Sequence, residues 1–297
     1  MNYSDGSPGN NLKGNPTSTQ SGMIIPKPGS TTIYYLFTVG TDYTGGLFNE
    51  NPGFNYYTID VSKNNNLGEI IDGPVNLAID HRTNIDLSKG WSEKVAAVKG
   101  KDCNTYWVVS FIGSTFYSYK IDSSGVKVSD VKVSSVSFTA NDKRGYLQVS
   151  PDGKKIVLAD YNAIGGNING SLTLFDFNNE TGVISASPEY LISNFSNASP
   201  YGVGFSRDSK KLYTSTYNGQ FNIYQFDLTS TNIPKSKKTI ISKFGFRGAL
   251  QLGPNGKIYV SIPDKSYLDA IENPSEEAEK VIYTENAIYL DGRLTGQ

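Results

Sequence analysis

The stretch Gly145-Tyr-Leu-Gln-Val-Ser-Pro-Asp-Gly-Lys-Lys-Ile-Val-Leu-Ala159 decides the fold class, because close variants of it return twice along the chain. The second copy is Tyr201-Gly-Val-Gly-Phe-Ser-Arg-Asp-Ser-Lys-Lys-Leu-Tyr-Thr-Ser215, and the third is Gly248-Ala-Leu-Gln-Leu-Gly-Pro-Asn-Gly-Lys-Ile-Tyr-Val-Ser261. Each copy is a short apolar strand, a polar turn and a second apolar strand. Asp, Asn and Gly tolerate the positive φ that tight turns demand, so each copy predicts a β-hairpin.

A second strand pair follows the hairpins. Ser171–Phe177 is followed by a predicted turn at 178–182 and a predicted strand at 183–185, and Phe221–Leu228 alternates polar and apolar residues. Four short strands in a repeat of roughly fifty residues are typical of propeller blades. Two degenerate units upstream, within 22–60 and 94–122, bring the recognisable blades to five.

The sequence therefore predicts an all-β β-propeller with four-stranded blades of the WD40 or YVTN type. A β-sandwich also has many short strands, but it has no reason to repeat its sequence. The predicted propeller domain covers 19–291, after an irregular tail or blade remnant at 1–18 and before a tail at 292–297. Residues 72–92 fit no blade and are predicted to form a long connection.

Composition and charge exclude several classes of function. The 27 basic and 28 acidic residues give a net charge of −1, which argues against a nucleic-acid partner because phosphate binding needs a basic excess. No apolar run is long enough to span a bilayer, so no membrane insertion is expected. The chain has one cysteine, Cys103, and one histidine, His81, which excludes a disulfide framework, a thiolate cage and a multi-histidine metal site.

Motifs for catalysis are weak. The glycine-rich segment 163–170 lacks the Gly-Lys-Ser/Thr ending of a phosphate-binding loop, and the repeated turns lack the ligand spacing of a calcium loop. Some propellers hydrolyse glycosides with paired carboxylates, or lactones with a metal at the channel mouth. Asp86, Glu93 and Asp160 are the carboxylates that such a reaction could use, and no cofactor is predicted.

Aligning the blades on the strand before each first turn gives a set of equivalent positions. In a propeller, residues that enter the innermost strand ring one mouth of the channel, and Tyr201 lies one step inside. Arginine, glutamate and tyrosine around a concavity could bind an anionic or sugar ligand, or could pair with one another. The predicted ligand-binding residues at this mouth are Gln20, Glu93, Arg144, Tyr201 and Arg247.

The ordered combination of several segments resembles one known family. These segments are Gly14–Ser21, Ile24–Gly29, Tyr106–Val109, Gly145–Gly153, Gly248–Val260 and Tyr267–Pro274. The chain resembles, over residues 3–291, the N-terminal propeller region of large surface proteins of gliding bacteria. Those proteins are exported by type IX secretion and carry a gliding-motility-associated C-terminal sorting domain.

The resemblance implies a location and an architecture but no catalytic residues. The family's first blade, signal peptide and sorting domain have no counterpart here, so we expect a fragment of a longer chain whose intact propeller has about six or seven blades. We expect an extracellular or cell-surface module that is not an enzyme and binds a protein or a glycan through loops on one face. A propeller hydrolase of the lactonase or glycosidase type is the alternative, and a purely structural spacer is a third.

Overall fold

The computed structural model describes residues 2–3, 12–41, 51–80, 83–162, 169–193, 198–217, 219–246 and 248–295. The chain divides into two compact units, and each is described by itself. The first unit comprises Met1–Lys143 and Phe177–Ala186, and the second comprises Arg144–Asp176 and Ser187–Gln297.

The first blade of the first unit contains β2 (Gly22–Pro26), β3 (Ile33–Val39), β4 (Phe54–Asp60) and β5 (Glu69–Asn76), antiparallel in this order. The two-residue strand β1 (Asn2–Tyr3) adds to the free edge of β5 in parallel. The sequence pattern assigns residues from Asp72 onward to a connection, and this is wrong for Asp72–Asn76. Those residues continue β5, because Tyr56 of β4 pairs with Val75.

The second blade contains β8 (Val95–Lys99), β9 (Tyr106–Ile112) and β10 (Thr115–Asp122). Its outer position is shared by β11 (Gly125–Val126) and β12 (Lys132–Ser135), which both pair with β10. Between the two blades, β6 (Ile79–Asp80) and β7 (Ile85–Asp86) form a small separate hairpin.

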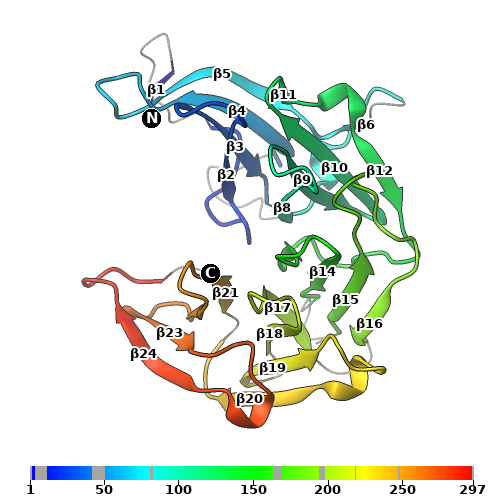
Figure 1. Cartoon of the computed structure of the whole chain (residues 1–297), viewed down its shortest axis with the longest axis vertical. Helices are drawn as coiled ribbons and strands as arrows, with labels where there is room; N and C mark the ends of the chain where they lie inside the picture. Colours follow the sequence, from blue (N-terminus) through cyan, green and yellow to red (C-terminus); the bar gives the residue numbers. More distant parts are fainter. Residues whose placement is uncertain are drawn as a thin grey trace. The chain divides into compact units, whose positions relative to one another are not determined.

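The second unit contains three four-stranded antiparallel blades in sequence order (Figure 1). They are β13 (Leu147–Val149), β14 (Lys155–Asp160), β15 (Ser171–Asp176) and β16 (Glu189–Ile192); β17 (Ser199–Phe205), β18 (Lys211–Tyr217), β19 (Phe221–Asp227) and β20 (Lys238–Lys243); and β21 (Ala249–Leu252), β22 (Ile258–Ser261), β23 (Tyr267–Ile271) and β24 (Tyr283–Tyr289). The predicted fourth strand at 183–185 is wrong. Ile184 makes only an isolated bridge to Phe177, and β16 lies further along the chain.

The chain is thus an all-β five-bladed β-propeller with antiparallel four-stranded blades, as the repeats predict. The helices in the described ranges are three-residue 3₁₀ turns such as Ser88–Gly90 and Pro234–Ser236. No helix in this part of the chain is long and apolar enough to cross a membrane.

Aromatic side chains dominate the core of the first unit. Phe54 stacks on Trp91 with ring centroids 5.8 Å apart, and Trp91 packs on Tyr117 at 5.2 Å. In the second unit, alternating apolar residues of β14, β15 and β17 form one core cluster, and those of β22 and β23 belong to another. Burying each such side chain contributes roughly 1.5–3 kcal/mol, so these clusters hold the strands in register.

Each hairpin turn of the second unit is followed by a lysine that forms an ion pair within its own blade. Lys155, Lys211 and Lys257 occupy equivalent places after each turn, and each pairs with a carboxylate at the end of the third strand of its blade. The Nζ atom of Lys155 lies 2.6 Å from Asp176, and that of Lys211 lies 3.3 Å from Asp227. The repeated lysine therefore joins the second and third strands of every blade in this unit.

Residues 177–186, which follow β15, belong to the first unit and pack on the second blade. The indole Nε1 of Trp107 donates a hydrogen bond to the carbonyl of Asn179 at 2.8 Å. Gly182 has a φ of 75°, and a Cβ added there would lie 2.4 Å from the Trp107 ring. Glycine is required at this position both by the backbone conformation and by the close approach of the indole.

Candidate functional site

Glu93, one of the predicted ligand-binding residues, is buried in the first unit. Its Oε2 atom accepts hydrogen bonds from the backbone N of Thr19 at 2.7 Å and from the Thr19 hydroxyl at 2.8 Å. Its Oε1 atom accepts a hydrogen bond from the Thr41 hydroxyl at 2.7 Å. The two carboxylate oxygens therefore bind the residues just before β2 and just after β3, which gives Glu93 a structural role.

Gln20 follows Thr19, which binds Glu93, and Gln20 itself contacts the start of β8. Its Oε1 atom accepts a hydrogen bond from the backbone N of Val95 at 3.2 Å. Sequence reasoning missed Lys94, which is fully buried and whose Nζ atom donates to the carbonyls of Asp142 at 3.4 Å and Lys143 at 2.9 Å. A lysine that opens an apolar strand was the only signal for it.

In the second unit, Arg144 and Tyr201 contact the same tyrosine. The guanidinium of Arg144 lies 5.0 Å from the ring centroid of Tyr161, and Tyr201 packs edge-on against that ring at 5.6 Å. Tyr201 also meets Tyr146 edge-on at 5.6 Å and has no exposed surface. The Tyr201 ring is therefore a core group, and Arg144 packs on the edge of this cluster.

The predicted set is divided between the units. Gln20 and Glu93 belong to the first, Arg144 and Tyr201 belong to the second, and Arg247 lies outside the described residues. Their convergence on one channel mouth stays a prediction.

The candidate carboxylates are placed in different surroundings. Asp86 is exposed, and hydrogen bonds from the side chain and backbone of Ser88 lower its pKa, which is opposite to what a general acid needs. Asp160 is buried on β14 in the second unit, and His81 and the segment 163–168 lie outside the described residues. Within the described ranges, no three His, Cys, Asp or Glu side chains lie close enough together to hold a metal ion.

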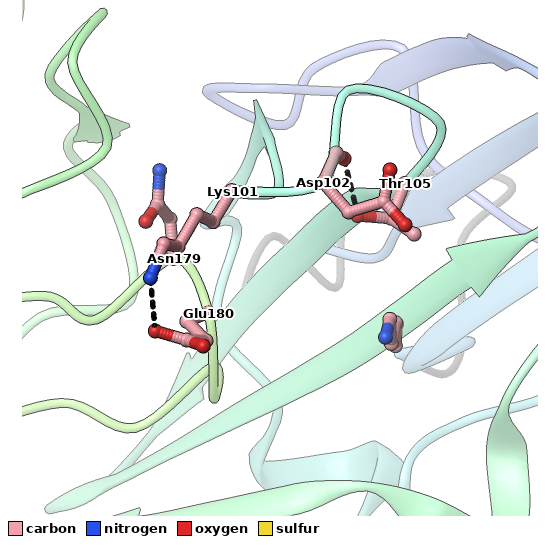
Figure 2. A pocket seen from close by; sticks show the side chains of 6 residues that line it. Lys101, Asp102, Thr105, Asn179 and Glu180 are labelled. Atoms are coloured by element: carbon pink, nitrogen blue, oxygen red, sulfur yellow. Dashed lines mark hydrogen bonds and ion pairs between the residues drawn. The ribbon is translucent and has the colours of Figure 1, made fainter.

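A polar cleft of about 410 Å³ lies in the first unit, between the turn that precedes β9 and the segment 177–186 (Figure 2). Its lining residues are Lys101, Asp102, Thr105, Lys120, Asn179 and Glu180. The Nζ atom of Lys101 pairs with Glu180 at 2.8 Å, and Thr105 Oγ1 donates to the carbonyl of Asp102 at 2.8 Å. The cleft offers donors and acceptors, but none of these residues is aromatic or aliphatic, so a ligand would gain little by leaving water there.

Exposed aromatic rings gather at one end of the last two blades. Phe244 is 98% exposed, and Phe246 is 40% exposed and packs on Tyr217 with ring centroids 4.8 Å apart. Tyr267 and Tyr289 are 37% and 57% exposed, and their centroids lie 5.0 Å apart. We call these five residues the aromatic end.

Strand pairing explains why these residues share one end. In the fourth blade, Tyr217 pairs with Phe221 and Phe221 pairs with Lys243, so β18 and β20 both finish there. The chain then passes through Phe244 and Phe246 to the start of β21. In the fifth blade, the pairs Ala249–Ser261, Ser261–Leu268 and Leu268–Ile288 continue the same end to Tyr267 and Tyr289.

An ion-pair network joins the two blades at the aromatic end. The Nζ atom of Lys243 lies 2.8 Å from Asp269 and 3.2 Å from Glu285. Asp269 also accepts a hydrogen bond from the Tyr283 hydroxyl at 2.6 Å and one from the backbone N of Asn286 at 2.9 Å. Burial alone would raise the pKa of Asp269, but these bonds and the nearby ammonium group outweigh it and lower that pKa. This network fixes the strands that carry the aromatic rings, and we call its residues, Lys243, Asp269, Tyr283, Glu285 and Asn286, the base of the aromatic end.

The repeated hairpins do not predict the aromatic end, because its residues lie outside them. The signal available was Phe244-Gly-Phe246, a pair of phenylalanines outside any alternating strand pattern and directly before the third repeat. Which strand ends meet in space is a matter of blade pairing, and the sequence does not state it directly.

Comparison with known proteins identifies the fold but neither a family nor an activity. No protein-family model matches the chain, and no curated protein matches it. It is similar to a solved β-propeller domain from Myceliophteria thermophila, with 12% identity and a TM-score of 0.51 over 89% of this chain and 70% of that one. It is also similar to a putative 6-phosphogluconolactonase from Bacteroides uniformis, with 14% identity and a TM-score of 0.50 over 88% of this chain and 69% of that one.

A puromycin-hydrolysing peptidase from Mycobacterium tuberculosis shares 15% identity at a TM-score of 0.52, over 91% of this chain but only 38% of the peptidase. At such identities the likeness concerns the fold alone. The similar structures include enzymes and a propeller domain whose description names no activity. The comparison therefore supports the β-propeller fold and does not identify an activity.

Proposed function

We propose that this chain is a non-enzymatic β-propeller module of a secreted or cell-surface protein, and that it binds a protein or glycan ligand through the aromatic end. The observation that carries the proposal is the exposure of Phe244, Phe246, Tyr267 and Tyr289 on adjoining loops and strand ends. Hydrating large apolar rings is unfavourable, and exposed rings that cluster together often mark an interaction site. Tyrosine and other large rings are also the residues that dominate binding energy at protein surfaces.

The rigidity of the base supports the same proposal. Lys243 and Asp269 hold the strands beneath the rings, so a ligand would meet rings whose backbone is already ordered. Less conformational entropy is then lost on binding, which favours affinity.

The chemistry of the carboxylates favours binding over hydrolysis. A glycosidase needs two carboxyl groups facing one cleft, one of them with a raised pKa. Glu93 has both oxygens engaged by threonines, and the pKa of Asp86 is lowered.

A direct binding experiment tests the proposal. Cys103 is the sole cysteine, is exposed and lies in the first unit, so biotin-maleimide would attach the whole chain to a sensor without modifying the second unit. We expect purified cell-surface proteins or surface polysaccharides of the source organism to bind the immobilised chain. A Phe244→Ser/Tyr289→Ser double variant should lose at least tenfold in affinity.

The hydrolase alternative is tested on the same preparation. Chromogenic aryl glycosides and aliphatic lactones should show no turnover above a buffer blank. Turnover that is abolished by Glu93→Gln, in a variant whose unfolding curve shows that it is folded, would overturn the proposal in favour of an enzyme.

The resemblance to type IX-secreted proteins of gliding bacteria supports the extracellular part of the proposal and a longer parent chain. We expect antibodies against this chain to label intact cells of the source organism and to detect a larger polypeptide there. Signal confined to the cytoplasmic fraction would contradict this location.

A further inference from the structure

We infer that the ligand of the aromatic end is a glycan chain, and that Tyr267 and Tyr289 are the platform on which its sugar rings stack. This inference rests on the proposed function and names the ligand class for the same site. The steps below concern the fifth blade alone.

The two tyrosines form a paired, exposed surface. Tyr267 opens β23 and Tyr289 closes β24, and the two residues face each other directly in the strand register. Their rings are tilted by 43° with centroids 5.0 Å apart, and both remain partly in water. A tyrosine face attracts the slightly positive C–H groups of a sugar ring, while its hydroxyl can bond the sugar's edge.

Two hydrogen-bonded segments flank the platform and hold it in shape. The backbone N of Thr295 donates to the carbonyl of Lys265 at 2.8 Å, and that of Asp264 donates to the carbonyl of Thr295 at 3.1 Å. The backbone N of Leu290 donates to the carbonyl of Ser266 at 2.9 Å. The residues just before Tyr267 are thus tied to those just after Tyr289.

Charged residues of both signs lie close to the two tyrosines in the sequence. Asp264, Lys265, Asp291 and Arg293 are all exposed and lie within four residues of one tyrosine or the other. Sugar hydroxyls both donate and accept hydrogen bonds, so a fringe of carboxylates, an ammonium group and a guanidinium suits them.

The same fringe argues against a protein partner for this platform. The centre of a protein–protein interface is depleted in charged residues and closely packed. Here the exposed large side chains near the platform in the sequence are the two tyrosines, Ile288 and Leu294, and four exposed charged residues lie among them along the chain. A hydroxyl-rich ligand that stacks on the rings and bonds to the fringe fits this arrangement better.

Affinity electrophoresis of the whole chain tests the inference. Native gels containing soluble xylan, pectin, alginate or laminarin would be run beside a gel without polysaccharide. We expect at least one polysaccharide to retard the chain, and Tyr267→Ala and Tyr289→Ala each to weaken that retardation at least tenfold. Arg293→Ala should weaken it several-fold.

Tyr190→Ala provides a matched control. Tyr190 is a similarly exposed tyrosine, 43% in contact with solvent, but it lies on β16 in another blade. This variant should be retarded as strongly as the wild type. Urea unfolding of each variant would confirm that the substitutions leave the fold intact.

The outcomes separate this inference from the proposed function. No retardation by any of the four polysaccharides, or retardation that survives both tyrosine variants, would overturn the glycan platform. If a purified surface protein still binds in a manner that depends on Phe244 and Tyr289, the proposed binding function stands with another ligand class. If the chain binds neither a polysaccharide nor a surface protein, both the glycan platform and the proposed binding function are wrong.

Discussion

The two ends of the blades in the second unit use their side chains in opposite ways. At the end that carries the repeated hairpin turns, Lys211 is buried and pairs with Asp227 and with Glu277. At the other end of these blades, Phe244 after β20 is almost fully exposed and Tyr289 of β24 is more than half exposed. At the turn end the charged groups pair with one another, whereas at the aromatic end large aromatic rings remain exposed to water.

The repeated and the variable parts of the sequence therefore lie at opposite ends of these blades. The turn end recurs in sequence because each blade of this unit has the same kind of hairpin and the same lysine–carboxylate pair. The aromatic end does not recur, since its loops differ in sequence and length between blades. Rigid scaffolds commonly carry their binding residues on such variable loops.

Breaking the base of the aromatic end should have the largest effect on stability. Asp269→Ala removes the partner of Lys243 and of the Tyr283 hydroxyl, both partly buried, and should cost about 3 kcal/mol in the free energy of unfolding. Urea titration at pH 7 measures it. A loss below about 1 kcal/mol would show that the network behaves like an ordinary surface pair.

The pH dependence of that loss follows from the lowered pKa of Asp269. A group whose pKa is lowered by folding contributes its full stability above its unfolded pKa, about 3.9, and loses it as the pH falls through the folded pKa. The difference between wild type and Asp269→Ala should therefore be constant from pH 7 to about pH 5 and shrink below about pH 4. A difference that grows in acid would contradict the lowered pKa.

Lys211→Met tests the turn end. The substitution leaves the carboxylate of Asp227 without its buried ammonium partner and should cost about 2 kcal/mol, less than a fully buried pair because both carboxylates are partly exposed. Thermal unfolding of the variant beside the wild type measures this. An unchanged melting temperature would mean that the methionine packs as well as the ion pair.

Lys155→Met sharpens the comparison between equivalent positions. Lys155 holds the same place in the repeat, but its side chain is 35% exposed and that of Asp176 is 72% exposed. Exposed pairs contribute about 0–1 kcal/mol, so the substitution should cost less than about 0.5 kcal/mol. An effect equal to that of Lys211→Met would show that position in the repeat matters more than burial.

Phe244→Ser should have the smallest effect on the fold. The side chain is 98% exposed, so the free energy of unfolding should stay within about 0.5 kcal/mol of wild type. Urea titration checks this, and a clear destabilisation would mean that Phe244 packs in the folded chain and is not held free for a partner.

Part of this molecule follows from the sequence alone. The repeated hairpins around Asp152, Asp208 and Asn255 predict the strands, the blades and the all-β class, because turn chemistry and alternating hydrophobicity act over a few neighbouring residues. The local errors have the same physical origin. Strand β16 and the last residues of β5 depend on pairing with a neighbouring strand, and their own patterns are weak.

The candidate site required the tertiary structure. Glu93 looked available as one acidic residue at a strand entrance, but threonines far away in sequence occupy both of its oxygens. The ring of Tyr201 is part of the core, because it packs against Tyr146 and Tyr161. Exposure and hydrogen-bond partners come from residues distant along the chain, so only the folded arrangement decides which rings are buried and which, such as those of Phe244 and Tyr289, remain in water.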